Sequence, residues 1–125
     1  MDNEELTKRA NELLDRGAID EAAALLEPFA AEGRTNAMSL LGFIHCFLAE
    51  SEDRKKIAEG AALLNEACQK GDASACHNLG TLWLGNSPNI GCDPRRAAEY
   101  YLRARELGGP VANEEFYEHW RKVLG

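Results

Sequence analysis

The sequence predicts an all-α fold, in which about three helical hairpins form a right-handed α-α superhelix (a solenoid) followed by a C-terminal capping helix. Ala, Leu and Glu are abundant and β-branched residues are scarce, which favours helix along the whole chain. Apolar residues recur at helical spacing in seven separate segments. Short sequence features also recur about every 37 residues, which is typical of stacked helical hairpins.

Residues that start or stop helices bound the expected elements. Asp2 with Glu5 resembles a capping box, and Asp93-Pro94 combines an N-cap with the first helical position that proline favours. Gly17 is expected to end the first helix. The expected helices span residues 3–16, 19–32, 36–49, 53–70, 72–85, 94–107 and 110–123, of which the first six pair as hairpins.

An internal repeat is visible in the sequence itself. The pattern Ala-x-x-x-Leu-Gly begins at Ala37 and again at Ala75, and Gly33, Gly71 and Gly108 follow the same period. Small residues let helix backbones approach closely, while the leucine fills the layer between hairpins. A single domain is expected over residues 1–125, with repeats at about 3–33, 34–71 and 72–108 and a cap at 109–125. The side chains expected to be buried are Ala37, Leu41, Ala75, Leu79, Ala104, Phe116 and Trp120.

Charge and hydropathy narrow the classes of function. The chain has 125 residues and a net charge of −7, which argues against nucleic acid or an anionic membrane as the partner. No apolar run approaches the ~20 residues of a membrane helix, and the acidic start is unlike a leader peptide, so a cytoplasmic location is expected. Residues 1–33 hold nine acids and three bases. This excess is either a solvated surface or an acidic end that attracts a basic partner.

The residue types that carry catalysis or bind metals lack the necessary arrangement. His45-Cys46 and Cys76-His77 are adjacent pairs without the spacing of a zinc site. No serine or cysteine stands in a nucleophile elbow, and no glycine-rich loop follows a strand. The sequence therefore predicts no catalytic residue, no cofactor and no metal, and the protein is not expected to be an enzyme.

One stretch resembles a complete Sel-one-like repeat, which is a longer-looped relative of the tetratricopeptide repeat. The matching residues are Ala75, Leu79, Gly80, Trp83, Gly85, Ile90, Gly91, Asp93, Ala97, Tyr100, Tyr101, Ala104 and Gly108. Residues 37–71 match with a shortened loop, and residues 3–33 form a degenerate copy. In the last helix Tyr117 stands at the glycine position, so we expect no further helix to pack against it.

The resemblance implies an interaction scaffold that binds a protein or peptide, because members of this family are mostly scaffolds. A bacterial regulatory, secretion-associated or immunity-type protein is a more specific version of this hypothesis. A small enzyme or ligand-binding protein of the cysteine-rich repeat type is the alternative. The oligomeric state expected for the scaffold is a monomer or a weak homodimer.

The cysteines take their expected roles from the same resemblance. Cys68 and Cys76 are similar to a pair that forms a disulfide in the cysteine-rich secreted subgroup, so the resemblance implies a bond. Two buried, reduced cysteines in the cytoplasm are the alternative. Cys46 and Cys92 are expected to pair with nothing. The link 85–93 is either an ordinary loop of this repeat class, with Ile90 between helices, or a contact loop that exposes Cys92.

The resemblance also implies a binding face, because the first helix of each hairpin lines the concave surface in this repeat class. Phe43 and Phe47 are expected to form an exposed apolar patch there, since the middle helix is apolar nearly all round. Burial of both aromatics, by the chain itself or in a dimer, is the alternative. The partner-binding residues expected are Glu12, Arg16, Ser39, Phe43, Phe47, His77 and Thr81, with Cys46 beside them.

Overall fold

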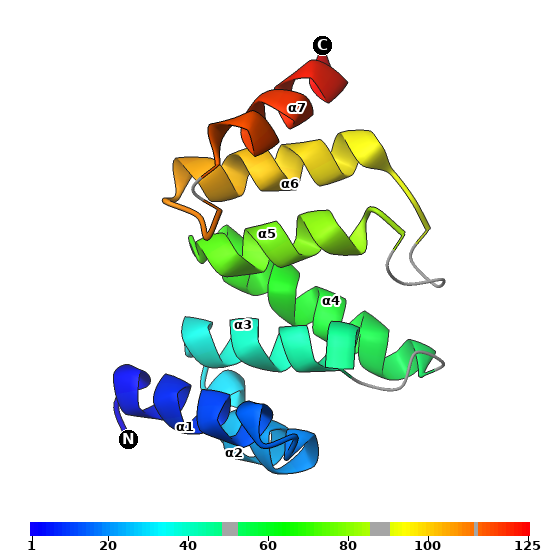
Figure 1. Cartoon of the computed structure of the whole chain (residues 1–125). Helices are drawn as coiled ribbons and strands as arrows, with labels where there is room; N and C mark the ends of the chain where they lie inside the picture. Colours follow the sequence, from blue (N-terminus) through cyan, green and yellow to red (C-terminus); the bar gives the residue numbers. More distant parts are fainter. Residues whose placement is uncertain (49–52, 86–90, 112) are drawn as a thin grey trace.

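The structure is a computed structural model that describes residues 1–48, 53–85, 91–111 and 113–125. Within these ranges it contains α-helices and one π-helical turn but no β-strand, which confirms the predicted all-α class. Successive helices run antiparallel from α1 at one end of the molecule to α7 at the other (Figure 1). The elements are α1 Asn3–Asp15, α2 Ile19–Ala31, α3 Thr35–Phe43, the π turn Ile44–Leu48, α4 Arg54–Gln69, α5 Ala73–Leu82, α6 Pro94–Glu106 and α7 Glu114–Leu124.

Aspartates begin several of these helices, as the sequence predicts. The Asp2 carboxylate accepts a hydrogen bond from the Glu5 backbone N–H at 2.8 Å, and Asp93 accepts one from the Arg96 N–H at 3.2 Å. Asp72 caps α5 through the Ala75 N–H at 2.9 Å. Each contact satisfies one of the amide groups that a helix leaves unpaired at its start.

The glycines that recur along the sequence end helices. Gly33, Gly71 and Gly108 have φ angles of 90°, 96° and 81°, a conformation that favours glycine. After each glycine the next residue donates its N–H back to the last helical turn. These bonds join Arg34 to the Phe29 carbonyl at 3.1 Å, Asp72 to that of Ala67 at 3.0 Å, and Gly109 to that of Ala104 at 2.8 Å. The glycines that recur with the predicted period therefore each mark the end of a helix.

Some predicted helix boundaries are wrong. The helix predicted for residues 72–85 ends at Leu82, because the Trp83 carbonyl instead accepts the Asp93 N–H at 2.8 Å. The last helix begins at Glu114 instead of residue 110, because Asn113 caps it through the Glu115 N–H at 2.9 Å. The helix predicted for residues 36–49 becomes α3 and then the π turn. Residue 49, Ile90 and Ala112 lie outside the described residues.

The core follows the prediction at six of the seven expected positions. The buried side chains are Ala37, Leu41, Ala75, Leu79, Ala104 and Trp120. Phe116 was expected to be buried but is half-buried, and its neighbour Tyr117 is only 2% exposed. Tyr117 turns toward the preceding turn, where its hydroxyl donates to the Val111 carbonyl at 2.8 Å. Phe116 packs edge-on against the Tyr101 ring at 4.9 Å instead.

Two glycines set the distance between α3 and α4. A Cβ atom on Gly42 would lie 2.8 Å from the Leu64 Cγ and 3.0 Å from the Gly60 carbonyl oxygen. A Cβ atom on Gly60 would lie 2.7 Å from the Cys46 Sγ and 2.9 Å from the Gly42 carbonyl oxygen. Neither position has room for a side chain, so the predicted role of Gly42 in close packing is confirmed.

A disulfide joins α4 to α5. Cys68 and Cys76 are bonded, with their Cα atoms 4.8 Å apart, and both side chains are buried. The expected proximity of this pair is confirmed, while its redox state in the cell stays a prediction. Cys46 is buried and free, and Cys92 is exposed and free. None of the described helices combines the length and apolarity needed to span a bilayer.

Candidate functional site

The aromatic pair Phe43 and Phe47 lies where α3 passes into the π turn. Met38, Leu41 and Ile44 take up the buried side of this segment. Phe43 and Phe47 are left half-buried, with ring centroids 5.4 Å apart. Phe47 packs against the main core, whereas Phe43 packs against neither core cluster of the described residues. The pair is therefore anchored at Phe47 and presents Phe43 at the surface.

Two residues expected beside this pair do not face a groove. Ser39 is only 6% exposed, and its hydroxyl lies 3.2 Å from the Asp72 carboxylate at the start of α5. Cys46 is buried, and its Sγ donates to the Ile57 carbonyl at 3.6 Å. Burial raises the pKa of Cys46 to about 12, so this thiol stays protonated and contributes to packing. The prediction that both residues line the binding face is wrong.

His77 and Thr81 lie on α5 and join an aromatic cluster with α6 and α7. The His77 ring lies 4.9 Å from that of Tyr101 and 5.8 Å from that of Phe116. The Thr81 hydroxyl is 2.8 Å from the Tyr101 hydroxyl. Burial lowers the pKa of His77, and its Nδ1 has no hydrogen-bond partner among the described residues. The two residues are half-buried, so part of this cluster is open to solvent.

Glu12 and Arg16 lie at the end of α1 and are exposed. Neither side chain forms a hydrogen bond or ion pair within the described ranges. Their role in binding a partner stays a prediction. The structure brings Phe43 together with Phe47, whose ring centroids are 5.4 Å apart, and His77 together with Thr81, whose hydroxyl donates to the His77 carbonyl at 3.3 Å.

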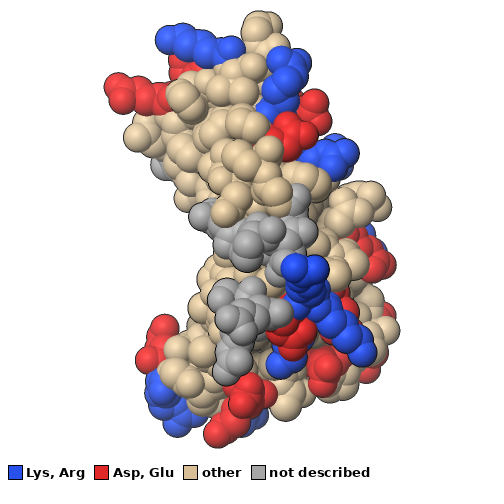
Figure 2. All heavy atoms as spheres, turned by 90° about the vertical axis from the view of Figure 1, so that its right-hand side faces the viewer, with Lys and Arg blue, Asp and Glu red and all other residues tan. Residues whose placement is uncertain are grey.

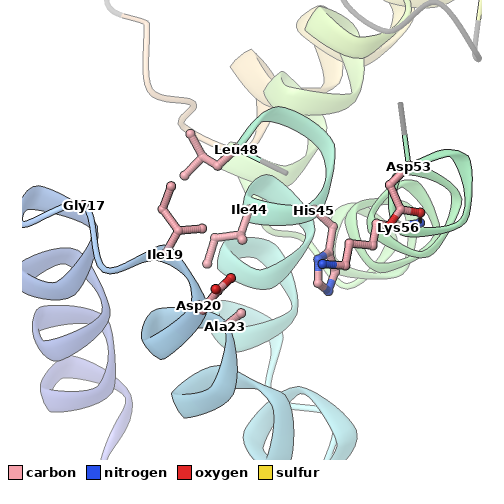
Figure 3. A pocket seen from close by; sticks show the side chains of 9 residues that line it. All are labelled: Gly17, Ile19, Asp20, Ala23, Ile44, His45, Leu48, Asp53 and Lys56. Atoms are coloured by element: carbon pink, nitrogen blue, oxygen red, sulfur yellow. Dashed lines mark hydrogen bonds between the residues drawn. The ribbon is translucent and has the colours of Figure 1, made fainter. Parts of the chain in front are cut away.

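A pocket of about 550 Å³ lies between the first two hairpins, and the sequence analysis did not anticipate it. It is formed by the α1–α2 turn, the first turns of α2 and α4, and the π turn (Figure 3). The lining residues are Gly17, Ile19, Asp20, Ala23, Ile44, His45, Leu48, Asp53 and Lys56. The sequence indicated this pocket only through the middle helix, which is apolar on every side. Because such a helix cannot bury all of its apolar residues, Leu48 is left outside the core.

The pocket combines an apolar wall with charged groups. Figure 3 shows Ile19, Ile44 and Leu48 pointing toward one another. Asp20 lies beside them, while Lys56 comes from the facing helix. The Asp53 carboxylate is occupied, because it accepts the Lys56 backbone N–H at 3.1 Å. The described residues contain no group of three or more His, Cys, Asp or Glu side chains that could hold a metal ion.

Comparisons with protein-family models, with curated proteins and with solved structures found no match to this chain.

Proposed function

We propose that this protein is a small helical-repeat adaptor that binds a partner protein or peptide. In this proposal the hairpins form a right-handed superhelix, and the first helices α1, α3 and α5 line its concave face. Contacts of α3 with both α1 and α5 support that arrangement. The repeated glycine stops, together with the resemblance to Sel-one-like repeats, support it as well.

The observation that carries the proposal is the aromatic pair. Phe43 is half-buried, packs against neither core cluster of the described residues, and has its ring contact with Phe47. An aromatic side chain that packs against a neighbour at one edge and is exposed to solvent at the other is typical of a binding hot spot. Because Ser39 and Cys46 are buried, the binding face in this proposal consists of Glu12, Arg16, Phe43, Phe47, His77 and Thr81.

Binding is favoured over catalysis by the position of the perturbed groups. The Cys46 thiol and the His77 imidazole have pKa values shifted by burial, and neither lines the pocket. Cys46 packs against Gly60, and His77 packs against aromatic rings. We therefore propose a protein without enzymatic activity that acts as a monomer or a weak homodimer, and its net charge of −7 disfavours nucleic acid and anionic membranes.

The test is affinity capture from an extract of the source organism, followed by mass spectrometry. The wild-type chain is compared with the double variant Phe43→Ala, Phe47→Ala and with Leu107→Ala. Leu107 is a suitable control, because it is a large apolar side chain that is 40% exposed on a different part of the molecule.

We expect a partner that wild type and Leu107→Ala retain and the double variant loses. Truncating two hot-spot aromatics costs at least ~2 kcal/mol of binding free energy, or about thirtyfold in affinity. A purified partner that binds the folded double variant with wild-type affinity contradicts the proposed binding face. Circular dichroism checks that both variants remain folded.

A further inference from the structure

The pocket between the first two hairpins has an apolar wall that the fold leaves unfilled. Ile44 is 2% exposed and forms its floor, whereas Leu48 is 36% exposed and lies at its rim. Ile19 and Ala23 face them from the first turns of α2. The π turn places Ile44 and Leu48 on this same wall, and π turns are frequently found at functional sites.

The exposed carboxylate of Asp20 lies next to this wall. Asp20 is exposed at the start of α2 and forms no ion pair or side-chain hydrogen bond with the described residues. Its surroundings are acidic as well. Residues 1–33 hold nine acids against three bases, and within the described part of the chain Glu32 alone among these acids forms an ion pair, with Arg34 at 3.5 Å. A cationic group that approaches Asp20 therefore meets a negative field that the chain itself does not neutralise.

The pocket also contains groups that would favour an anionic ligand. The balance of charge decides whether a cationic or an anionic ligand is favoured. Lys56 is an exposed ammonium group, and His45 lines the same pocket. Arg54 and Lys55 come directly before Lys56 in the first turn of α4 and are exposed as well. The net charge of −6 over residues 1–33 outweighs them. Figure 2 faces the edge of the molecule where the α1–α2 turn and the start of α4 lie, and acidic and basic side chains are interspersed over its lower half. Electrostatic complementarity therefore favours a basic ligand over an acidic one.

We propose that this pocket is the subsite for a basic, amphipathic segment of the partner protein. An aliphatic side chain of that segment inserts between Ile19, Ile44 and Leu48, and a neighbouring Lys or Arg pairs with Asp20. The volume of about 550 Å³ accommodates such a side chain together with part of its backbone. This inference rests on the proposed function, and it adds the chemistry of the partner to it.

The experiment selects random displayed dodecapeptides on the full-length protein and measures the affinity of the enriched peptides by fluorescence anisotropy. Asp20→Lys is compared with Glu21→Lys. Both variants change the net charge equally on one helical turn, but Glu21 does not line the pocket. Ala23→Met fills the apolar part of the pocket, and Lys56→Glu adds a second carboxylate. Circular dichroism verifies that each variant is folded.

We expect enriched peptides that combine an aliphatic residue with Lys or Arg nearby. Asp20→Lys and Ala23→Met should each weaken their binding about tenfold or more, whereas Glu21→Lys should weaken it by less and Lys56→Glu should strengthen it. Enrichment of acidic peptides overturns the inference, and so does an equal effect of Asp20→Lys and Glu21→Lys.

The two proposals fail in different ways. If peptides lose binding to the Phe43→Ala, Phe47→Ala variant but bind Ala23→Met with unchanged affinity, the pocket inference is overturned. That result is consistent with the proposed function. If no peptide is enriched on the wild-type protein, the pocket is not a peptide subsite. A partner still captured through Phe43 and Phe47 in that case keeps the proposed function intact.

Discussion

At the scale of single residues, His77 shows how packing changes the chemistry of a side chain. Its ring packs against the rings of Tyr101 and Phe116, and its buried Nδ1 has no hydrogen-bond partner among the described residues. The charged imidazolium form loses contact with water when it is buried, and no neighbouring acceptor at Nδ1 replaces that water. Burial therefore lowers the pKa of His77 below its ordinary value of 6.5. Burial thus keeps this histidine neutral inside an aromatic cluster.

This lowered pKa predicts a specific loss of stability in acid. The unfolded chain binds a proton at His77 more readily than the folded chain does, so stability falls as the pH drops through 6.5 toward the lowered value. We expect the thermal midpoint to fall between about pH 7.5 and about pH 5.5, and to fall by less in His77→Gln. His119→Gln changes an exposed histidine and should keep the wild-type difference. An identical pH dependence in wild type and His77→Gln would contradict this account.

At the scale of helices, the junctions between successive hairpins occupy equivalent positions in the repeat but differ in chemistry. Ala30 and Met38 at the first junction are buried in the main core. Cys68 and Cys76 at the second are joined covalently. At the third, Arg105 replaces the first cysteine and pairs with Glu114 at 2.9 Å. Packing, a disulfide and an exposed ion pair thus connect the hairpins in turn.

The disulfide contributes measurable stability although it closes a short loop. The bonded cysteines are 8 residues apart in sequence, and loop-closure entropy for such a loop corresponds to about 2–3 kcal/mol. We expect reductant to lower the thermal midpoint of the wild-type protein and to leave that of a Cys68→Ala, Cys76→Ala variant unchanged. Titration that finds all four thiols reactive in denatured, unreduced protein would show that the bond does not form in that preparation.

Several helix ends could be predicted from the sequence because local residues determine them, whereas the end of α5 and the start of α7 could not. Asp93 caps α6 and Pro94 takes its first position, as these residue types favour, and Gly71 ends α4 with a φ angle of 96°. Features that depend on two elements were missed. Ser39 is buried because Asp72 arrives from the next hairpin. The π turn follows the close crossing at Gly42 and Gly60, which no periodicity within one helix reveals.

The candidate site was predictable only in part, for the same reason. Periodicity within the middle helix identified Phe43 and Phe47 as surplus apolar residues, and the structure leaves both half-buried. The pocket brings together Ile19, Leu48 and Lys56 from three separate elements. Each of these residues is ordinary in its local sequence, so only the packing of the hairpins shows that they share a cavity.

At the scale of the whole molecule, the described residues form two apolar cores instead of one. The larger extends from α1 to Ala104 of α6, whereas the smaller lies between α6 and α7 around Tyr101 and Trp120. The Trp120 ring lies 5.1 Å from that of Tyr101. Helix α7 has α6 as its main neighbour, and its Phe116 ring also lies 5.8 Å from the His77 ring of α5. In a stack with nearest-neighbour contacts, stability is the sum of such local terms.

This arrangement predicts that a substitution that destabilises α7 does not destabilise the N-terminal helices. Trp120→Ala removes a side chain that is 9% exposed, and such a truncation costs roughly 3–5 kcal/mol. We expect hydrogen exchange of the α7 amides to accelerate by about a hundredfold or more, while the α1 to α4 amides keep their wild-type rates, because they open independently of the smaller core. Lys122→Ala, an exposed change in the same helix, should leave α7 protected. Equal acceleration in α1 and α7 would mean that the two cores unfold as one cooperative unit, and that the nearest-neighbour description of the stack is wrong.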